Sequence, residues 1–382
     1  MYFKRSEQGE KPIKPCKKMG SITGIKCLVI YHWIIGHTYR GWNFGTKLSN
    51  FKRVLLILWN LLFLAVISYH AYKMLIYVSK KGEKLDQQSY KKHLILIFLE
   101  NARAIFNATQ TIFYLVFLLI RGKHILEAIH SWDLSQIERK TERKIGIIIT
   151  LTVFLTTFSY QWILTYLYYK SGLIDPTVDY LLVAPMLYFL LFNTHIIIIS
   201  LIAYQSCVIH FQLKTISDNI PKHKLNYLYK FSLKLSKHIR NFDKLISIYT
   251  LTALAINSLI CISFVCKLCL DQSRSLGGIA TLIESTGTLF GLCLVCDIIP
   301  NSYREFCDKL SDYYYFSENS CLTADDESLS KLLYVRSILS HLFGIQNDLC
   351  FTAFGLFRVN TNTFISCVAF ITTHSVILIQ TN

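Results

Sequence analysis

The residues of this sequence that could bind a ligand lie within long apolar stretches. Glu100, Arg103 and Glu284 are ionisable residues among Leu, Ile, Val and Phe. A charged side chain is costly in lipid, so such residues are expected to face the interior of a helix bundle or water. Glu100 and Arg103 lie three residues apart on one helical face, where they could equally neutralise each other. Glu284 has no charged residue within one helical turn, which makes it the best charged candidate for a ligand contact.

Aromatic and amide side chains form a second set of candidate ligand contacts. One apolar stretch ends FSYQWILTYLYY, in which Tyr160, Gln161 and Trp162 could hold a small organic molecule by stacking and hydrogen bonding. Tyr188 and Asn193 are polar positions inside the next apolar stretch. The alternative for the first group is an aromatic belt at a membrane surface, which has the same composition.

Catalytic and metal-binding patterns are scarce in the sequence. Cys266-x-x-Cys269 followed by Cys293-x-x-Cys296 superficially resembles a zinc site. The pairs stand in apolar runs and are too far apart for a usual zinc ribbon, so we interpret them as small packing residues. The sequence contains no Gly-rich phosphate loop, no Gly-x-Ser-x-Gly elbow and no paired-His metal motif. We therefore expect a protein that is not an enzyme and needs no cofactor.

The elements that must position the candidate residues are membrane-spanning helices. The chain has 382 residues, of which 52% are hydrophobic and only 17% charged, and its mean hydropathy is +0.37. A helix of about 20 apolar residues crosses a hydrocarbon core of about 30 Å. The sequence predicts an all-α, polytopic membrane protein with six clear spans and a shorter seventh, at 54–78, 94–120, 145–169, 180–208, 246–270, 277–299 and 363–380.

The basic residues predict the orientation of these spans. The net charge of +16 would suggest nucleic acid as the partner of a soluble chain, but in a membrane protein the excess belongs in cytoplasmic loops. Of the 40 Lys and Arg residues, 30 lie in segments on the amino-terminal side of the membrane and 7 on the opposite side. We therefore predict a cytoplasmic amino terminus, an extracellular carboxyl terminus and no binding of nucleic acid.

Four regions follow from this topology. Residues 1–53 form a cytoplasmic amino-terminal segment, and 54–299 contain the first six helices. Within that region, apolar residues at helical spacing between lysines predict that 209–245 extends two spans into the cytoplasm, with a break at Pro221. Residues 300–362 form a cytoplasmic helical anchor segment, and 363–382 contain the seventh helix and the extracellular end.

The last part of the chain, residues 351–380, reads FTAFGLFRVNTNTFISCVAFITTHSVILIQ. This segment resembles the end of an insect gustatory receptor. The family has an Ala-x-Gly-x-Phe segment before its last span, and here the matching residues are Ala353, Gly355 and Phe357. Its last span carries Thr-Tyr, five apolar positions, Gln and Phe, and Thr373 and Gln380 stand at the corresponding separation.

Two positions depart from that motif, because His374 replaces the Tyr and Thr381 replaces the final Phe. In the sugar-sensing branch of the family an acidic residue tends to follow the Tyr, whereas Ser375 stands here. The resemblance therefore favours a bitter or otherwise aversive small-molecule tastant over a sugar.

The resemblance implies an inverted seven-helix, ligand-gated, non-selective cation channel. It also implies a ligand pocket in the outer half of the helices in 54–299, and an anchor at 300–362 where subunits meet. Four subunits, identical or combined with other gustatory receptor subunits, would enclose one pore that conducts Na⁺, K⁺ and Ca²⁺. The seventh helix would line it with Thr373, Val376, Gln380 and Thr381, the first three of which recur at helical spacing on one face. Such a channel would lie among the lipids of the plasma membrane of chemosensory neurons.

Two other functions fit a polytopic membrane protein. A G-protein-coupled receptor also has seven spans, but that class has an extracellular amino terminus. In addition, Asp-Arg-Tyr is missing from the inner end of the third predicted span and Asn-Pro-x-x-Tyr from the seventh. A secondary transporter often consists of two similar halves, and no such repeat is visible in the sequence.

Overall fold

The computed structural model describes most of the chain after residue 89. The described residues are 23–34, 58, 61, 65, 72, 90–132, 138–170, 178–270, 276–319 and 326–380. The predicted first span, 54–78, lies outside them except for those isolated positions.

The described residues are almost entirely helical, which confirms the predicted all-α class. The helices are α1 (Thr23–Ile34), α3 (Tyr90–Ser131), α4 (Arg139–Lys170), α5 (Val178–Ser217), the short 3-10 helix η2 (Ile220–Lys222), α6 (Leu225–Leu270), α7 (Leu276–Asn319), α8 (Asp326–Gln346) and α9 (Thr361–Gln380). Between α8 and α9 the strands β1 (Thr352–Ala353) and β2 (Phe357–Arg358) pair antiparallel, Thr352 with Arg358 and Ala353 with Phe357.

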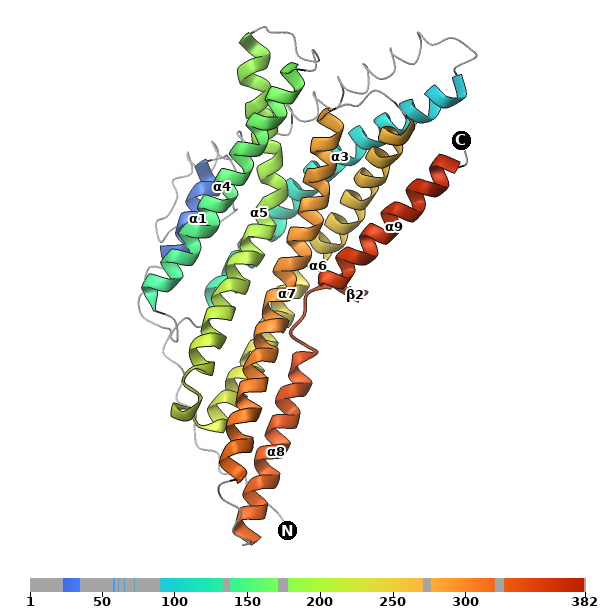
Figure 1. Ribbon diagram of the computed structural model, residues 1–382. Coiled ribbons are helices and arrows are strands. Elements are labelled where there is room, and N and C mark those ends of the chain that lie inside the picture. The colour runs from blue at the N-terminus through green and yellow to red at the C-terminus, as the bar shows by residue number, and fades with distance from the viewer. Residues whose placement is uncertain are drawn as a thin grey trace.

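The long helices run side by side as one bundle (Figure 1). The core contains Tyr249 of α6, whose ring lies 4.8 Å from that of Tyr114 and 5.9 Å from that of Phe117, both on α3. α1 packs against α4, and Ile25 and Leu28 of α1 are completely buried.

Five helical segments of the described chain are long and apolar enough to cross a membrane: Lys140–Tyr160, Ile196–Ser217, Leu225–Cys269, Thr281–Tyr314 and Thr361–Gln380. They overlap the predicted spans 145–169, 180–208, 246–270, 277–299 and 363–380. The predicted span 94–120 lies within α3, where the shorter apolar stretch Thr109–Leu118 stands among the described residues. The chain is a multi-pass membrane protein.

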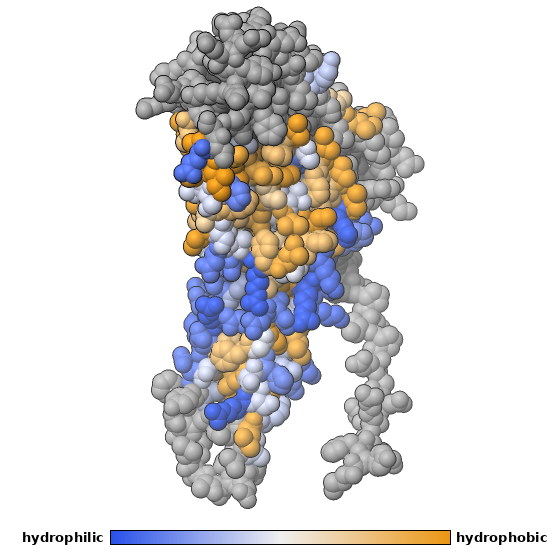
Figure 2. Space-filling model, turned by 90° about the vertical axis from the view of Figure 1, so that its right-hand side faces the viewer, coloured by the Kyte–Doolittle hydropathy of each residue, from blue (hydrophilic) through white to orange (hydrophobic). Residues whose placement is uncertain are grey.

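Several helices are longer than a membrane is thick. α6 has 46 residues, which corresponds to about 69 Å at 1.5 Å per residue, against a hydrocarbon core of about 30 Å. Figure 2 shows the two parts of the bundle, with a hydrophobic zone above a hydrophilic band. The range 209–245, which we predicted to extend beyond the membrane, consists of the end of α5, η2 with Pro221, and the start of α6.

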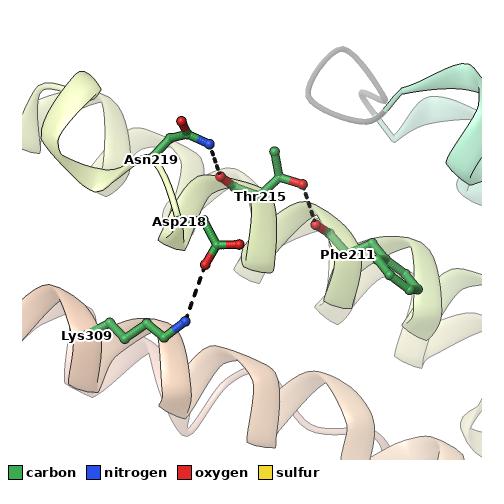
Figure 3. A network of polar contacts seen from close by, with 5 residues as sticks. All are labelled: Phe211, Thr215, Asp218, Asn219 and Lys309. Atoms are coloured by element: carbon green, nitrogen blue, oxygen red, sulfur yellow. Dashed lines mark hydrogen bonds and ion pairs between the residues drawn. The ribbon is translucent and has the colours of Figure 1, made fainter.

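Polar contacts hold the turn at the lower end of α5 (Figure 3). The Asn219 side-chain amide donates a hydrogen bond of 2.8 Å to the backbone carbonyl of Thr215. The Thr215 hydroxyl in turn donates to the backbone carbonyl of Phe211 at 2.9 Å. Asp218 accepts from Lys309 of α7 at 3.5 Å. These groups terminate α5 and tie its end to α7, although an exposed ion pair of this kind contributes little stability.

α8 and α9 lie one above the other along the same flank of the bundle (Figure 1). α8 borders the lower half of α7, whereas α9 lies beside the upper part of α6 and contacts α7 near its own first turn. The β1–β2 hairpin marks the level between α8 and α9. This arrangement places the hairpin where the hydrophilic part of α6 and α7 gives way to the apolar part.

Candidate functional site

A hydrogen bond between α4 and α7 brings two sequence-predicted candidates together. The Tyr160 hydroxyl donates to Glu284 Oε2 at 2.7 Å, although the residues stand 124 positions apart. Both side chains are partly buried. The neighbouring Ser285 is buried, and the Thr288 hydroxyl donates to the Glu284 carbonyl at 2.9 Å. The Glu284 carboxylate therefore has a hydrogen-bond donor from the neighbouring helix α4, which lowers the cost of placing an acid among apolar residues.

The other predicted ligand residues do not join this pair in the described structure. Trp162 lies two residues after Tyr160, but its side chain is 63% exposed on the surface of α4. The side chains of Glu100, Gln161, Tyr188 and Asn193 lie outside the described residues. The Tyr160–Glu284 hydrogen bond is therefore the contact between predicted ligand residues that the described residues show, and a ligand pocket at this place stays a prediction.

One stripe of α9 packs against the bundle. The partly or fully buried residues of this helix recur three or four positions apart and are Thr363, Phe364, Cys367, Ile371, Ser375 and Ile379. The Phe364 ring lies 5.3 Å from that of Phe290 on α7. The Cys266 thiol of α6 donates to the Ser375 carbonyl at 3.9 Å. α9 thus packs against both α6 and α7.

The predicted pore residues lie off that stripe. Thr373, Val376 and Gln380 are all exposed in the single chain, and Thr381 is outside the described residues. Ser375 is buried, and its backbone carbonyl is the group that accepts from α6. The surface of α9 that carries the predicted pore residues is therefore available to a neighbouring subunit, to water or to lipid.

The β1–β2 hairpin is fixed to α6 by a carboxylate. Asp243 accepts two hydrogen bonds from Thr352, one from its backbone N–H at 2.7 Å and one from its hydroxyl at 2.6 Å. The Thr250 hydroxyl donates to the Thr352 carbonyl at 2.8 Å. The backbone N–H of Phe354 donates to the Ser247 carbonyl at 3.1 Å. Three positions of α6 therefore bind consecutive polar groups of the hairpin.

The tip of the hairpin requires left-handed backbone conformations. Phe354 has a φ of 54° and Gly355 a φ of 74°. Glycine adopts this region without strain, whereas Phe does not. The hydrogen bond from the Gly355 N–H to the Thr352 hydroxyl, at 3.1 Å, supports the turn. The Ala-x-Gly-x-Phe segment of the predicted motif thus runs from the end of β1 through the turn to the start of β2.

Exposed contacts hold the lower side of the hairpin. Arg240 of α6 pairs with Asp348 just after α8. The Cys350 thiol donates to the Asn347 carbonyl at 3.4 Å. Burial raises the pKa of the Cys350 thiol, so this side chain stays a neutral donor at physiological pH.

A second carboxylate, on α7, holds the start of α9. Asp297 accepts from the backbone N–H of Thr361 at 2.9 Å and also from the Thr361 hydroxyl. Asn360 caps the helix by accepting from the Thr363 N–H at 2.9 Å. Both acceptors satisfy first-turn N–H groups that have no partner within the helix, and the charge of Asp297 complements the helix dipole.

Sequence reasoning missed Asp243 and Asp297. Their signal was present but weak. Each aspartate stands at the edge of a predicted apolar span, and Asn-Thr-Asn-Thr at 360–363 is a helix-start pattern. What the sequence could not supply was the pairing, since Asp243 and Thr352 are 109 positions apart and Asp297 and Thr361 are 64 apart.

Comparisons with known proteins find similarity in structure alone. No protein-family model matches the sequence, and no curated protein matches it either. The solved structure of the insect olfactory receptor OR5 from Machilis hrabei is similar, with a TM-score of 0.57 and 14% sequence identity over 94% of this chain and 98% of that one. The same receptor in complex with eugenol gives a TM-score of 0.60 and 15% identity at the same coverage.

This likeness extends over nearly the full length of both chains, so the chain has the overall fold of these receptors. Neither structure is of an enzyme.

Proposed function

We propose that this chain is a subunit of a chemosensory, ligand-gated cation channel of the plasma membrane. The observation that carries the proposal is the position of Thr373, Val376 and Gln380, which share an exposed surface of α9 away from the stripe packed on α6 and α7. A helix that packs along one stripe and presents hydroxyl and amide groups elsewhere can line an aqueous pore between subunits. The fold shared with the insect olfactory receptor supports this function.

The finer assignment to taste rests on the motif at 351–380. Gustatory receptors are the family that this segment resembles, and a bitter or aversive small organic molecule is the ligand class that we propose. One similar receptor binds eugenol, a small aromatic molecule. The Tyr160–Glu284 pair, with its hydrogen-bonding groups between α4 and α7, is the site that we propose for such a ligand.

We propose a tetramer with a cytoplasmic amino terminus as the working assembly, formed by this chain alone or with related subunits. Na⁺, K⁺ and Ca²⁺ would pass along the axis, where a ring of Gln380 amides at the outer end could coordinate a partly hydrated cation without binding it tightly. Lipids would cover the apolar surfaces of the outer helices, and chemosensory neurons are the cells in which we expect it.

Purified full-length protein in planar bilayers provides the test. We expect discrete cation currents, and Gln380→Ala should change unitary conductance or ion preference because the amide contacts the permeating ion. Leu378→Ala, which is exposed but lies about 160° around α9 from Gln380, is the control and should change conductance less. Saturable, gradient-coupled uptake of an organic solute without unitary currents would instead identify a transporter and end the channel proposal.

A further inference from the structure

Three features at the base of α9 together suggest how this helix is controlled. They are the bonds from Asp297 to Thr361, the position of Glu284 on the same helix as Asp297, and Pro300 just beyond Asp297. None of these is needed to explain how the helices pack, and each concerns the segment of α7 that borders α9.

Glu284 and Asp297 occupy one continuous helical segment. They are thirteen residues apart on α7, which places them about 20 Å apart along its axis. The upper residue is bonded to α4 through Tyr160, and the lower residue is bonded to α9 through Thr361. A displacement of this segment that breaks or tightens the upper contact must therefore act on the lower one.

Pro300 places a flexible point directly below this segment. Proline has no N–H, so α7 lacks the hydrogen bond that residue 300 would donate to the carbonyl of Cys296. Helices bend preferentially at such positions. The part of α7 above Pro300, which carries both Glu284 and Asp297, can therefore tilt against the part below, which is tied to α5 through Lys309 and Asp218.

The hairpin below α9 is held by a different helix. Asp243, Thr250 and the Ser247 carbonyl, all on α6, fix Thr352 and Phe354. The chain leaves this fixed hairpin at Arg358 and begins α9 at Thr361, where Asp297 binds. The hairpin is thus attached to α6, whereas the first turn of α9 is attached to α7. When α7 tilts, α9 can therefore rotate about the short connection between the hairpin and α9.

We propose that Asp297 is a positioning residue that makes α9 follow the upper segment of α7, and that the hairpin bound to Asp243 is the pivot. The gating role rests on the proposed channel function, whereas the mechanical link between α7 and α9 does not. In the ligand-free protein the link holds α9 in its resting position. A movement of α7 at the Tyr160–Glu284 pair is transmitted to α9 through the carboxylate of Asp297.

The mechanical link is tested by a distance measurement in the purified full-length protein. Spin labels are introduced as a non-natural amino acid at the exposed positions Ile283 on α7 and Ile365 on α9, because the chain contains twelve cysteines. Labelled subunits are diluted with unlabelled ones so that distances within a subunit dominate. The wild type should give a narrow distance distribution, and Asp297→Ala should broaden or shift it. Asp308→Asn, an exposed aspartate lower on α7, is the matched control and should match the wild type.

The gating role is tested in bilayers without added ligand. Asp297→Ala should raise the ligand-free open probability at least fivefold while leaving unitary conductance unchanged, because α9 is released but its exposed surface is intact. Asp297→Asn keeps an oxygen that accepts from Thr361 and should restore most of the wild-type behaviour. A merely structural role for Asp297 would lower the amount of folded protein and leave the open probability of the surviving channels unchanged.

The two experiments separate the two proposals. If Asp297→Ala gives the same narrow distance distribution as the wild type, the link is refuted whatever the currents show. If the wild type conducts no ions, the channel function fails and the distances still decide whether Asp297 joins α7 to α9. Should Asp297→Ala not fold, Thr361→Val removes the hydroxyl half of the same contact. Wild-type distances and open probability in Thr361→Val would then overturn the proposal.

Discussion

Individual carboxylates mark the positions where one helix is joined to the next. Glu284 accepts a hydrogen bond from α4, Asp243 accepts from the hairpin and Asp297 accepts from α9. Each accepts hydrogen bonds from hydroxyl or backbone groups, which is the arrangement that lets a charged group persist beside apolar surroundings. Their contacts are side chain to side chain or side chain to backbone between distant segments, so each is accessible to a single substitution.

Replacement of Glu284 by Gln should shift the ligand response. The substitution keeps the size of the side chain and an oxygen that can accept from Tyr160, but it removes the charge. Hydrogen bonds to charged groups contribute about 1.5–3 kcal/mol, so we expect the half-maximal ligand concentration to change by about tenfold or more. Patch recordings normalised to surface protein, with compounds that activate the wild type, measure this shift.

Tyr160→Phe should move the response in the same experiment but by a smaller factor, since it removes the donor and leaves the carboxylate. Unitary conductance should stay at the wild-type value in both variants, because the hydrogen bond of the pair joins α4 to α7 whereas the predicted pore residues lie on α9. Trp162→Phe on the exposed surface of α4 is the comparison. An altered conductance with an unaltered concentration response would assign Glu284 to the pore and not to the ligand site.

Close helix contacts depend on glycine at one place in the bundle. At Gly24 of α1, an added Cβ would lie 2.4 Å from the Glu142 carbonyl oxygen of α4, and at Gly146 of α4 it would lie 2.2 Å from the Gly24 carbonyl oxygen. These neighbours are backbone atoms that cannot move aside as a side chain can. The hydrogen bond from Tyr204 to Glu142, at 2.9 Å, adds α5 to the same contact. α1 can therefore pack this closely on α4 only because neither Gly24 nor Gly146 has a side chain.

Gly24→Ala or Gly146→Ala should separate α1 from α4 and lower stability by about 1–3 kcal/mol, the usual cost of overpacking. A lower unfolding temperature of the detergent-solubilised protein and reduced surface expression are the expected measurements. Gly287→Ala on α7 is the matched control, because a Cβ there meets nothing within 4 Å. Equal stability of all three variants would show that α1 does not pack on α4 in this way.

The whole molecule combines a bundle that crosses the membrane with one that projects beyond it. The hydrophobic zone and the hydrophilic band follow one another along the same helices (Figure 2), so no separate domain is needed to build the anchor segment. α9 buries little of its surface in the single chain. A helix of this kind is stable only with further partners, and other subunits around a pore together with lipid supply them in the proposed assembly.

The orientation of this assembly is predicted by the distribution of basic residues, with 30 of 40 Lys and Arg on the amino-terminal side. An epitope tag after Asn382 should be stained on intact cells, whereas a tag before Met1 should be stained only after permeabilisation. An untagged intracellular marker controls for leaky cells. The reverse staining pattern would contradict the inverted topology and favour a G-protein-coupled receptor.

The sequence by itself determined the helical class, most of the long apolar segments and the candidate residues of α9. These features depend on local composition and on the helical period, both of which can be read in a window of about 20 residues. It also singled out Glu284, because an isolated acid in an apolar run is costly wherever the helix packs.

Only the tertiary structure decided which residues meet. Tyr160 and Glu284, Asp243 and Thr352, and Asp297 and Thr361 are joined by the packing of whole helices, and no local pattern records the rotation of one helix against another. The structure likewise decided that Trp162 faces outwards and Ser375 inwards. The sequence of a helix predicts that a buried polar side chain needs a hydrogen-bond partner. Because a helix packs against several neighbours, only the tertiary structure decides which residue that partner is.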